Sequence, residues 1–89
     1  MARVVFTSNL QRHVDSSAAS VAGGTVRTAL EQVFAENRVL RGYIVDEHGR
    51  LRKHMAIFVD GRPLLDREEL SDPIGESSEI YVMQALSGG

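Results

Sequence analysis

The chain has 89 residues, of which 43% are hydrophobic and 25% are charged, and these values are typical of one small globular domain spanning residues 1–89. It contains no cysteine, which excludes disulfides, thiolate metal sites and a cysteine nucleophile. Ten Lys and Arg residues against twelve Asp and Glu give a formal net charge of −2, which argues against a general nucleic-acid surface or an anionic-membrane surface.

The N-terminal part of the chain predicts a β-hairpin. Residues 3–9 (RVVFTSN) are rich in β-branched and aromatic residues and carry no helix signal, so they predict a first strand. Polar turn formers fill residues 10–17, and residues 17–22 (SAASVA) predict a second strand. The apolar segment around Val4 is too short for a signal peptide, and no apolar run approaches the roughly 20 residues that span a bilayer. We therefore expect a cytoplasmic protein.

The clearest helix signal follows the Gly23-Gly24 break. Thr25 is placed to cap the first amides of the helix, and Asn37 is placed to end it in a left-handed C-cap. Apolar residues recur at helical spacing in between, which predicts an amphipathic helix lying on a sheet. That apolar stripe consists of Val26, Ala29, Leu30, Val33 and Phe34, and the opposite, polar face consists of Arg27, Thr28, Glu31, Gln32 and Glu36.

Residues 39–47 (VLRGYIVDE) permit two interpretations. Leu40, Tyr43 and Ile44 have the spacing of a short helical turn. Alternatively, residues 43–45 form a strand that pairs with Leu51 through a turn at residues 48–49. The sequence alone leaves this choice open.

The C-terminal half predicts two strands and an edge segment. Residues 55–59 (MAIFV) form a continuous apolar run closed by Asp60-Gly61, which predicts a central strand followed by a tight turn. Residues 62–65 are expected at a sheet edge, because Pro63 cannot donate a hydrogen bond to a ladder. Residues 79–84 (EIYVMQ) alternate with period 2 and contain no Gly or Pro, so they predict the last strand.

Residues 66–78 predict a polar surface loop between these strands. Leu70 and Ile74 are its expected apolar anchors, and residues 67–70 are expected to form one helical turn. The whole element order predicts an α+β roll, in which a mixed sheet of four to five strands carries one main helix on one face. The first strand can pair parallel to the last through the helical crossover, and the other sheet face has no element to cover it.

The chain closes with the small-residue segment Ala85-Leu86-Ser87-Gly88-Gly89. Because glycine has no Cβ, a Gly-Gly end can lie extended in a channel too narrow for side chains. Such a tail can bring its carboxylate next to the catalytic groups of another protein. The alternative is a frayed chain end, since small residues are common there. We expect residues 85–89 to form a flexible tail.

Together these features resemble the MoaD/ThiS family of ubiquitin-like sulfur carriers over essentially the whole length. The resemblance is strongest in residues 49–54 (GRLRKH) running into residues 55–61, and in the closing strand that leads to Gly88-Gly89. The turn at residues 57–62 (IFVDGR) belongs to the same pattern. Leu70-Ser71-Asp72 also resembles the sequence of ubiquitin at the same place before the last strand.

The resemblance implies a β-grasp fold and a chemically activated terminus. An E1-like enzyme would use ATP and magnesium to adenylate the carboxylate of Gly89, and a sulfur donor would convert it to a thiocarboxylate. The acceptor would be a cysteine synthase-like enzyme or the large subunit of a molybdopterin synthase. The chain itself would bind no cofactor and would be a substrate rather than an enzyme, although it could form the small subunit of such a synthase.

The same resemblance assigns roles along the tail and on the open sheet face. Gly89 would carry the reacting carbon, Gly88 would permit close approach, and Leu86 and Ser87 would contact the channel. Because the chain ends at Gly89, no processing protease is expected. If Ile57, Val59, Ile80 and Val82 point toward the helix, period 2 sends a partner-docking patch outward. That patch consists of Phe58, Tyr81 and Met83.

Alternatives remain for both the patch and the function. Residues 39–54 could fold over the patch and bury it. The protein could be a modifier that forms isopeptide bonds through Gly89, or a binding module whose tail is incidental.

The remaining polar motifs predict no further site. Three histidines, His13, His48 and His54, have no metal-ligand spacing and are expected on the surface. The basic run at residues 50–54 either steers an acidic partner or is a solvated edge.

Overall fold

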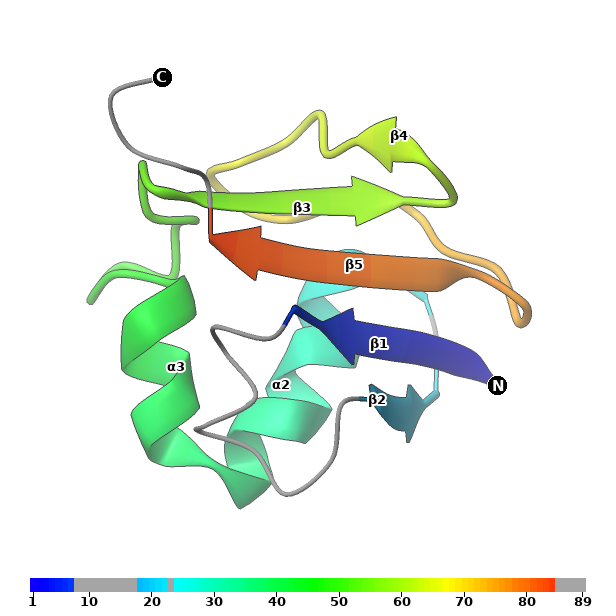
Figure 1. Cartoon of the computed structure of the whole chain (residues 1–89), viewed down its shortest axis with the longest axis horizontal. Helices are drawn as coiled ribbons and strands as arrows, with labels where there is room; N and C mark the ends of the chain where they lie inside the picture. The colour runs from blue at the N-terminus through cyan, green and yellow to red at the C-terminus, as the bar shows by residue number, and fades with distance from the viewer. Residues whose placement is uncertain (8–17, 23, 85–89) are drawn as a thin grey trace.

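The computed structural model describes residues 1–7, 18–22 and 24–84. Within them the elements follow the predicted order, with one added helix (Figure 1). They are β1 (Ala2–Phe6), β2 (Ala18–Val21), α2 (Val26–Glu36), α3 (Arg38–Ile44), β3 (Met55–Val59), β4 (Arg62–Pro63) and β5 (Glu79–Gln84). The first strand is shorter than predicted, and the predicted turn at residues 10–17 lies outside the described residues.

The last strand of the chain lies at the centre of the sheet. The strand order is β2-β1-β5-β3-β4, so β5 has neighbours on both sides (Figure 1). It pairs parallel with β1 and antiparallel with β3, which confirms the predicted mixed sheet and the parallel pairing of the first and last strands. β4 lies at the edge, as Pro63 predicts.

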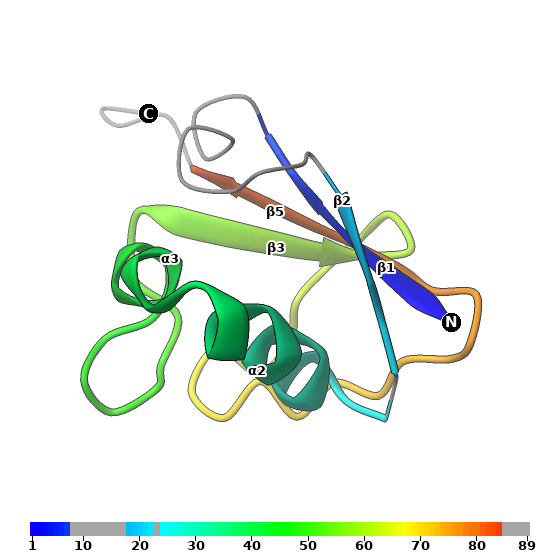
Figure 2. The same cartoon turned by 90° about the horizontal axis from the view of Figure 1, so that it is seen from below.

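Both helices cover the same face of this sheet (Figure 2). α2 is the predicted main helix, and the short helical turn that the sequence left open beside it is the second helix, α3. Leu40 and Ile44 of α3 are fully buried and belong to the same core as α2 and the inner faces of the strands. A seven-residue helix is marginal alone, so this burial is what stabilises α3.

Asn37 joins the two helices in a way that the sequence did not predict. Its φ of −148° and ψ of 89° are not left-handed, so the predicted C-cap geometry was wrong. Its amide donates to the carbonyls of Val33 and Phe34 and ends α2. Its side-chain Oδ1 accepts from the amide of Leu40 at 3.0 Å and so caps α3. One residue thus ends one helix and begins the next.

The core lies between the helices and the inner face of the sheet. The apolar stripe predicted for α2 is buried, as are the alternate residues of β1, β3 and β5. Among the largest fully buried side chains are Phe6, Leu30, Leu40, Ile44, Met55, Ile57, Leu70 and Ile80.

The segment after α3 combines both interpretations that the sequence left open. The helix continues through Ile44, and the next residue, Val45, forms an isolated antiparallel bridge with Leu51. The turn between them is held by Asp46, whose Oδ1 accepts from the amides of His48 and Arg50 at 2.8 and 3.0 Å. These donors, the Arg50 amide first, lower the pKa of Asp46. Gly49 closes the turn with a φ of 81°.

Two aspartates organise the long loop before β5. Asp66 accepts from the amides of Glu68 and Glu69 and from Ser71, while Asp72 accepts from the amide of Asp66 at 2.9 Å. The Glu69 amide and the Ser71 hydroxyl are the main causes that lower the pKa of Asp66 to about 2. The predicted helical turn is present as one turn, in which the Leu70 amide donates to the carbonyl of Asp66.

This loop also completes the beginning of α2. Thr25 caps the helix as predicted, because its hydroxyl accepts from the amide of Thr28 at 3.2 Å. The amide of Val26 donates instead to the loop carbonyl of Asp72. Leu70 is buried in the core and Ile74 packs against it, which confirms both predicted anchors.

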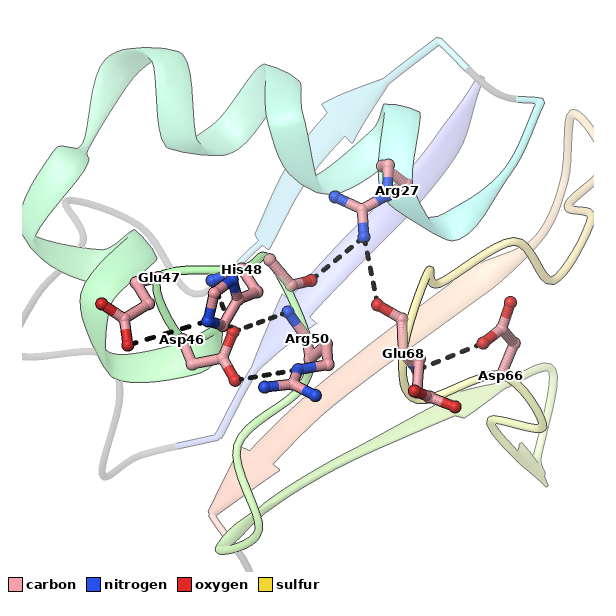
Figure 3. Close-up of polar contacts among 8 residues, drawn as sticks. Arg27, Asp46, Glu47, His48, Arg50, Asp66 and Glu68 are labelled. Atoms are coloured by element: carbon pink, nitrogen blue, oxygen red, sulfur yellow. Dashed lines mark hydrogen bonds and ion pairs between the residues drawn. The ribbon is translucent and has the colours of Figure 1, made fainter.

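Arg27 joins the loop to the turn at residues 46–49. Its Nε donates to the Glu69 carbonyl at 2.6 Å and its Nη2 to the Gly49 carbonyl at 3.0 Å. Nη2 also donates to the Glu68 carbonyl at 3.4 Å (Figure 3). The prediction that Arg27 belongs to the wet face of α2 was therefore wrong, since the side chain is half-buried against two loops.

Candidate docking face

The open face of the sheet carries the predicted patch. Pairing places Tyr81 of β5 opposite Phe58 of β3, and Met83 opposite Ala56. Directly paired residues share a face of the sheet, so Phe58, Tyr81 and Met83 lie together. Phe58 and Met83 are half-buried and Tyr81 is 37% exposed, although Ile57, Ile80 and Val82 beside them are buried. The predicted alternation is confirmed for these strands.

The cross-strand register extends this patch beyond the three predicted residues. Val5 of β1 pairs with the other side of Tyr81, and Pro63 of β4 pairs with Phe58. One row of apolar side chains therefore crosses four strands. Val5 and Pro63 were not predicted to join the patch, because periodicity shows which face a residue occupies and does not show its partner on the next strand.

The patch also borders a shallow hollow of about 520 Å³. Its lining consists of Phe58, Asp60, Gly61, Glu79, Tyr81 and Met83. The alternative that residues 39–54 cover this face is wrong for their helical part, because α3 packs on the opposite side of the sheet (Figure 2). An accessible apolar hollow with an aromatic residue at its centre is a typical feature of protein-docking surfaces.

A rigid turn closes one end of the hollow. Asp60 and Gly61 have φ values of 50° and 84°, as a two-residue hairpin turn requires, which confirms the predicted tight turn. The Asp60 carboxylate accepts from the amide of Glu79 at 2.9 Å and from the hydroxyl of Ser78 at 3.0 Å. These two donors, the amide first, lower the pKa of Asp60. The turn is thereby tied to the start of β5.

The other end of the face is the point from which the chain continues toward its terminus. β5 ends at Gln84, which pairs with Met55, the first residue of β3. The predicted tail residues Leu86, Ser87, Gly88 and Gly89 lie outside the described residues. The structure therefore fixes where the tail begins. β5 ends at Gln84, one residue after Met83 of the patch, so the tail follows directly from a central strand of the sheet.

The prediction that the histidines lie on the surface is confirmed for the two that the structure describes. His48 and His54 are exposed, and His13 lies outside the described residues. Across residues 1–7, 18–22 and 24–84, no group of three or more His, Asp or Glu side chains could hold a metal ion. In the same part of the chain, no helix has the length and apolar character needed to cross a membrane.

The basic run at residues 50–54 is mostly exposed and lies beside the end of β5. Arg50 pairs with Asp46, with Nε and Oδ2 3.3 Å apart. Arg52 instead donates from Nε to the carbonyl of Gly42 at 2.8 Å. The run is therefore partly fixed to the backbone of α3.

Comparison with known proteins gives the fold a context. No family model and no curated protein sequence matches the chain. Solved structures do match, and one chain of the Amycolatopsis orientalis BexX/CysO complex superposes with a TM-score of 0.86 at 16% identity, covering 100% of both chains. Mycobacterium tuberculosis CysO gives 0.83 at 17% identity, covering 97% of this chain and 100% of that one. The chain has the β-grasp fold.

A third similar structure is the small archaeal modifier protein 1 of Methanosarcina acetivorans. It gives a TM-score of 0.84 at 20% identity, covering 99% of this chain and 95% of that one. In all three cases the match includes nearly the whole of both molecules. At these identities the likeness establishes the shared β-grasp architecture, and the chemistry has to be argued from the chain's own residues.

Proposed function

We propose that this β-grasp protein is a cytoplasmic sulfur carrier whose Gly89 carboxylate is activated by an E1-like enzyme and converted to a thiocarboxylate. The observation that carries the proposal is the position of β5. This strand lies at the centre of the sheet, contributes Tyr81 and Met83 to the open face, and ends one residue later at Gln84. An enzyme that docks on the face therefore receives the five following residues from a fixed starting point.

The proposed chemistry needs nothing from this chain except its terminus. A Gly89 carboxylate oxygen attacks the α-phosphorus of ATP in the partner's site, forming an acyl adenylate and releasing pyrophosphate. Hydrosulfide from a sulfur donor then attacks the carbonyl carbon, and AMP leaves with the electrons of the broken C–O bond. Two easier steps replace one difficult step, because a free carboxylate is a poor electrophile.

In this scheme, strand β5 and the Gly-Gly end that follows it have different roles. A rigid strand fixes the direction of approach, and the Gly88-Gly89 sequence leaves the narrowest possible end. Much of the partner's rate gain would then come from positioning the carboxylate against ATP. In this proposal the chain is a substrate of its enzymes rather than a catalyst.

The comparisons support a protein partner for this chain. One matching chain belongs to a complex named for two proteins, BexX and CysO. A β-grasp chain of the same size is thus found bound to a second protein. We propose that the acceptor of the sulfur is a cysteine synthase-like enzyme or a molybdopterin synthase large subunit, as the sequence resemblance implies.

Intact-mass spectrometry tests the proposal directly. The purified chain is incubated with extract of its host, ATP, magnesium and a sulfide source, and a chain lacking Gly89 serves as the matched control. We expect a mass gain equal to the exchange of one oxygen for one sulfur, located at Gly89 and absent from the control. No gain in an extract that converts another carrier would overturn the proposal.

A second candidate function is protein modification through an isopeptide bond at Gly89. It is favoured by the similarity to structures named small archaeal modifier protein 1, from Haloferax volcanii and Methanosarcina acetivorans. Higher-mass conjugates that disappear when Gly88 and Gly89 are deleted would support this function. Thiocarboxylate formation without conjugates would support the carrier alone.

A further inference from the structure

Positive charge gathers around the segment that leads into β3, at residues 50–54 and Arg67. A hollow of about 530 Å³ is lined by four cationic side chains and only two carboxylates, so it carries an excess of two positive charges. The cations are Arg50, Arg52, Lys53 and Arg67, and the carboxylates are Asp46 and Glu68. This excess contrasts with the net negative charge of the whole chain.

The register places part of this charge beside the last residue of β5. Lys53 and His54 directly precede Met55, which pairs with Gln84, the last residue of β5. Figure 1 shows the start of β3 and the end of β5 at the same end of the sheet. We call Arg52, Lys53, His54 and Arg67 the basic rim. A partner that takes up the tail must pass close to it.

The guanidinium groups of the basic rim are held by backbone carbonyls. Arg67 donates from Nη2 to the carbonyls of Arg52 and Met55 at 2.8 and 2.9 Å. Arg52 donates to the Gly42 carbonyl, and no described carboxylate lies within ion-pair distance of Arg52, Lys53 or Arg67. Carbonyls fix these groups in place without neutralising them. Their charge is therefore preorganised for a carboxylate from outside the chain.

We infer that the basic rim docks on an acidic surface of the activating enzyme, beside the opening that receives the tail. This inference rests on the proposed function and adds the kind of surface that the enzyme presents. Paired charges at this position would fix the orientation of the carrier on the enzyme, because the apolar row alone carries no charge that could distinguish one orientation from another. They would also raise the rate of encounter at low ionic strength.

The test is ATP–pyrophosphate exchange by the E1-like enzyme of the same host, with the full chain as the varied substrate. Lys53→Glu reverses one charge of the rim at an exposed residue with no hydrogen bond or ion pair among the described residues. Arg38→Glu, on the exposed first turn of α3, makes an equal charge change away from the rim and is the matched control. Thermal unfolding confirms that both variants fold.

We expect Lys53→Glu to raise KM about three- to tenfold at low salt, with kcat unchanged, and Arg38→Glu to leave both unchanged. The difference should disappear at about 0.5 M NaCl, where charges are screened within a few ångströms. If the wild type supports exchange and Lys53→Glu has the same KM as the wild type, the inference is overturned and the proposed function stands. No exchange by the wild type would overturn both.

Nucleic acid is the competing partner for a basic surface, and one further measurement separates it. A single-stranded RNA oligonucleotide is offered to the wild type and to Lys53→Glu in filter binding. RNA retention that Lys53→Glu abolishes, together with an unchanged KM, would assign the rim to RNA and overturn the inference. We expect no retention, because the chain as a whole is acidic.

Discussion

The two faces of the β3–β5 pair are built from the same strands and differ in almost every physical property. On the inner face, Ile57, Ile80 and Val82 are buried beneath two helices. Both helices of the described residues lie on the inner side of the sheet (Figure 2). On the outer face, the paired residues Phe58 and Tyr81 line an open hollow. Period-2 alternation alone produces this difference.

The contrast teaches that stability and recognition are separated within single strands. A residue on the inner face contributes mainly to the free energy of folding, because its apolar surface leaves water when the chain folds. A residue on the outer face can contribute little to folding and much to binding, because its apolar surface leaves water only when a partner docks. Ile80→Ala and Tyr81→Ala test this separation directly. Gly49→Ala and Asp66→Asn, which lie in loops outside these strands, should have intermediate effects on stability.

Ile80→Ala should have the largest effect on folding. Ile80 is fully buried and pairs with Val4 on one side and Val59 on the other. Truncating it removes apolar contacts and leaves a cavity, at a cost of about 2–5 kcal/mol. Urea unfolding followed by circular dichroism measures the loss. A cost below about 1 kcal/mol would mean that the inner face is not the structural core.

Gly49→Ala should have the next largest effect on stability, because Gly49 lies in the turn that hydrogen bonds to Arg27 of α2. Gly49 has a φ of 81°, and an added Cβ would lie 3.0 Å from Nη1 of Arg27. Left-handed strain and this close approach should together cost about 1–3 kcal/mol.

Gly42→Ala is the matched control for Gly49→Ala. Gly42 lies inside α3, and an added Cβ there would meet nothing within 4 Å. This substitution should stabilise the protein by about 0.5–1 kcal/mol, since alanine is the better helix former. Equal effects of the same sign in the two variants would contradict the assigned backbone conformations.

These results also show how far the sequence could predict the fold. The hydrophobic stripe of α2 and the alternation of β3 and β5 are local patterns, so the buried residues and the outward direction of Phe58, Tyr81 and Met83 could be read directly. The seven-residue helix α3 could be read only as one of two alternatives, because its stability comes from the burial of Leu40 and Ile44 against distant elements.

The candidate site was predictable to the same local extent. Val5 and Pro63 join the apolar row through cross-strand register, which depends on distant partners. Asn37 was expected to end α2 with left-handed geometry, yet it caps the following helix, because α3 begins immediately after it. The hydrogen bonds of Arg67 to the carbonyls of Arg52 and Met55 likewise follow from tertiary contact alone.

Asp66→Asn should change the pH dependence of stability. The pKa of Asp66 is about 2 in the folded protein, below its ordinary value of 3.8, so the unfolded chain binds more protons between these values. Its contribution is therefore complete above about pH 5 and is lost as the pH falls through the folded pKa. The wild type should be more stable than Asp66→Asn at neutral pH, and the difference should shrink toward pH 2.

Chemical denaturation at several pH values measures this difference. Glu31→Gln, on the exposed side of α2, removes an equal charge and should keep the wild-type slope. A difference between wild type and Asp66→Asn that stays constant from neutral pH to about pH 2 would show that the loop does not depend on this carboxylate.

Tyr81→Ala should have the smallest effect on folding and a large effect on partner binding. Tyr81 is 37% exposed, and its hydroxyl makes only a 3.4 Å hydrogen bond to Glu79, so the loss of cross-strand contact should cost less than about 1 kcal/mol. If the open face docks on the activating enzyme, the same truncation should raise KM for adenylation at least about tenfold. Urea unfolding and ATP–pyrophosphate exchange on one preparation separate the two effects. If Tyr81→Ala loses as much stability as Ile80→Ala, the outer row contributes to folding as the inner face does. If Tyr81→Ala keeps the wild-type KM, the outer row does not contribute to binding of the enzyme. Either result would remove the distinction between the faces.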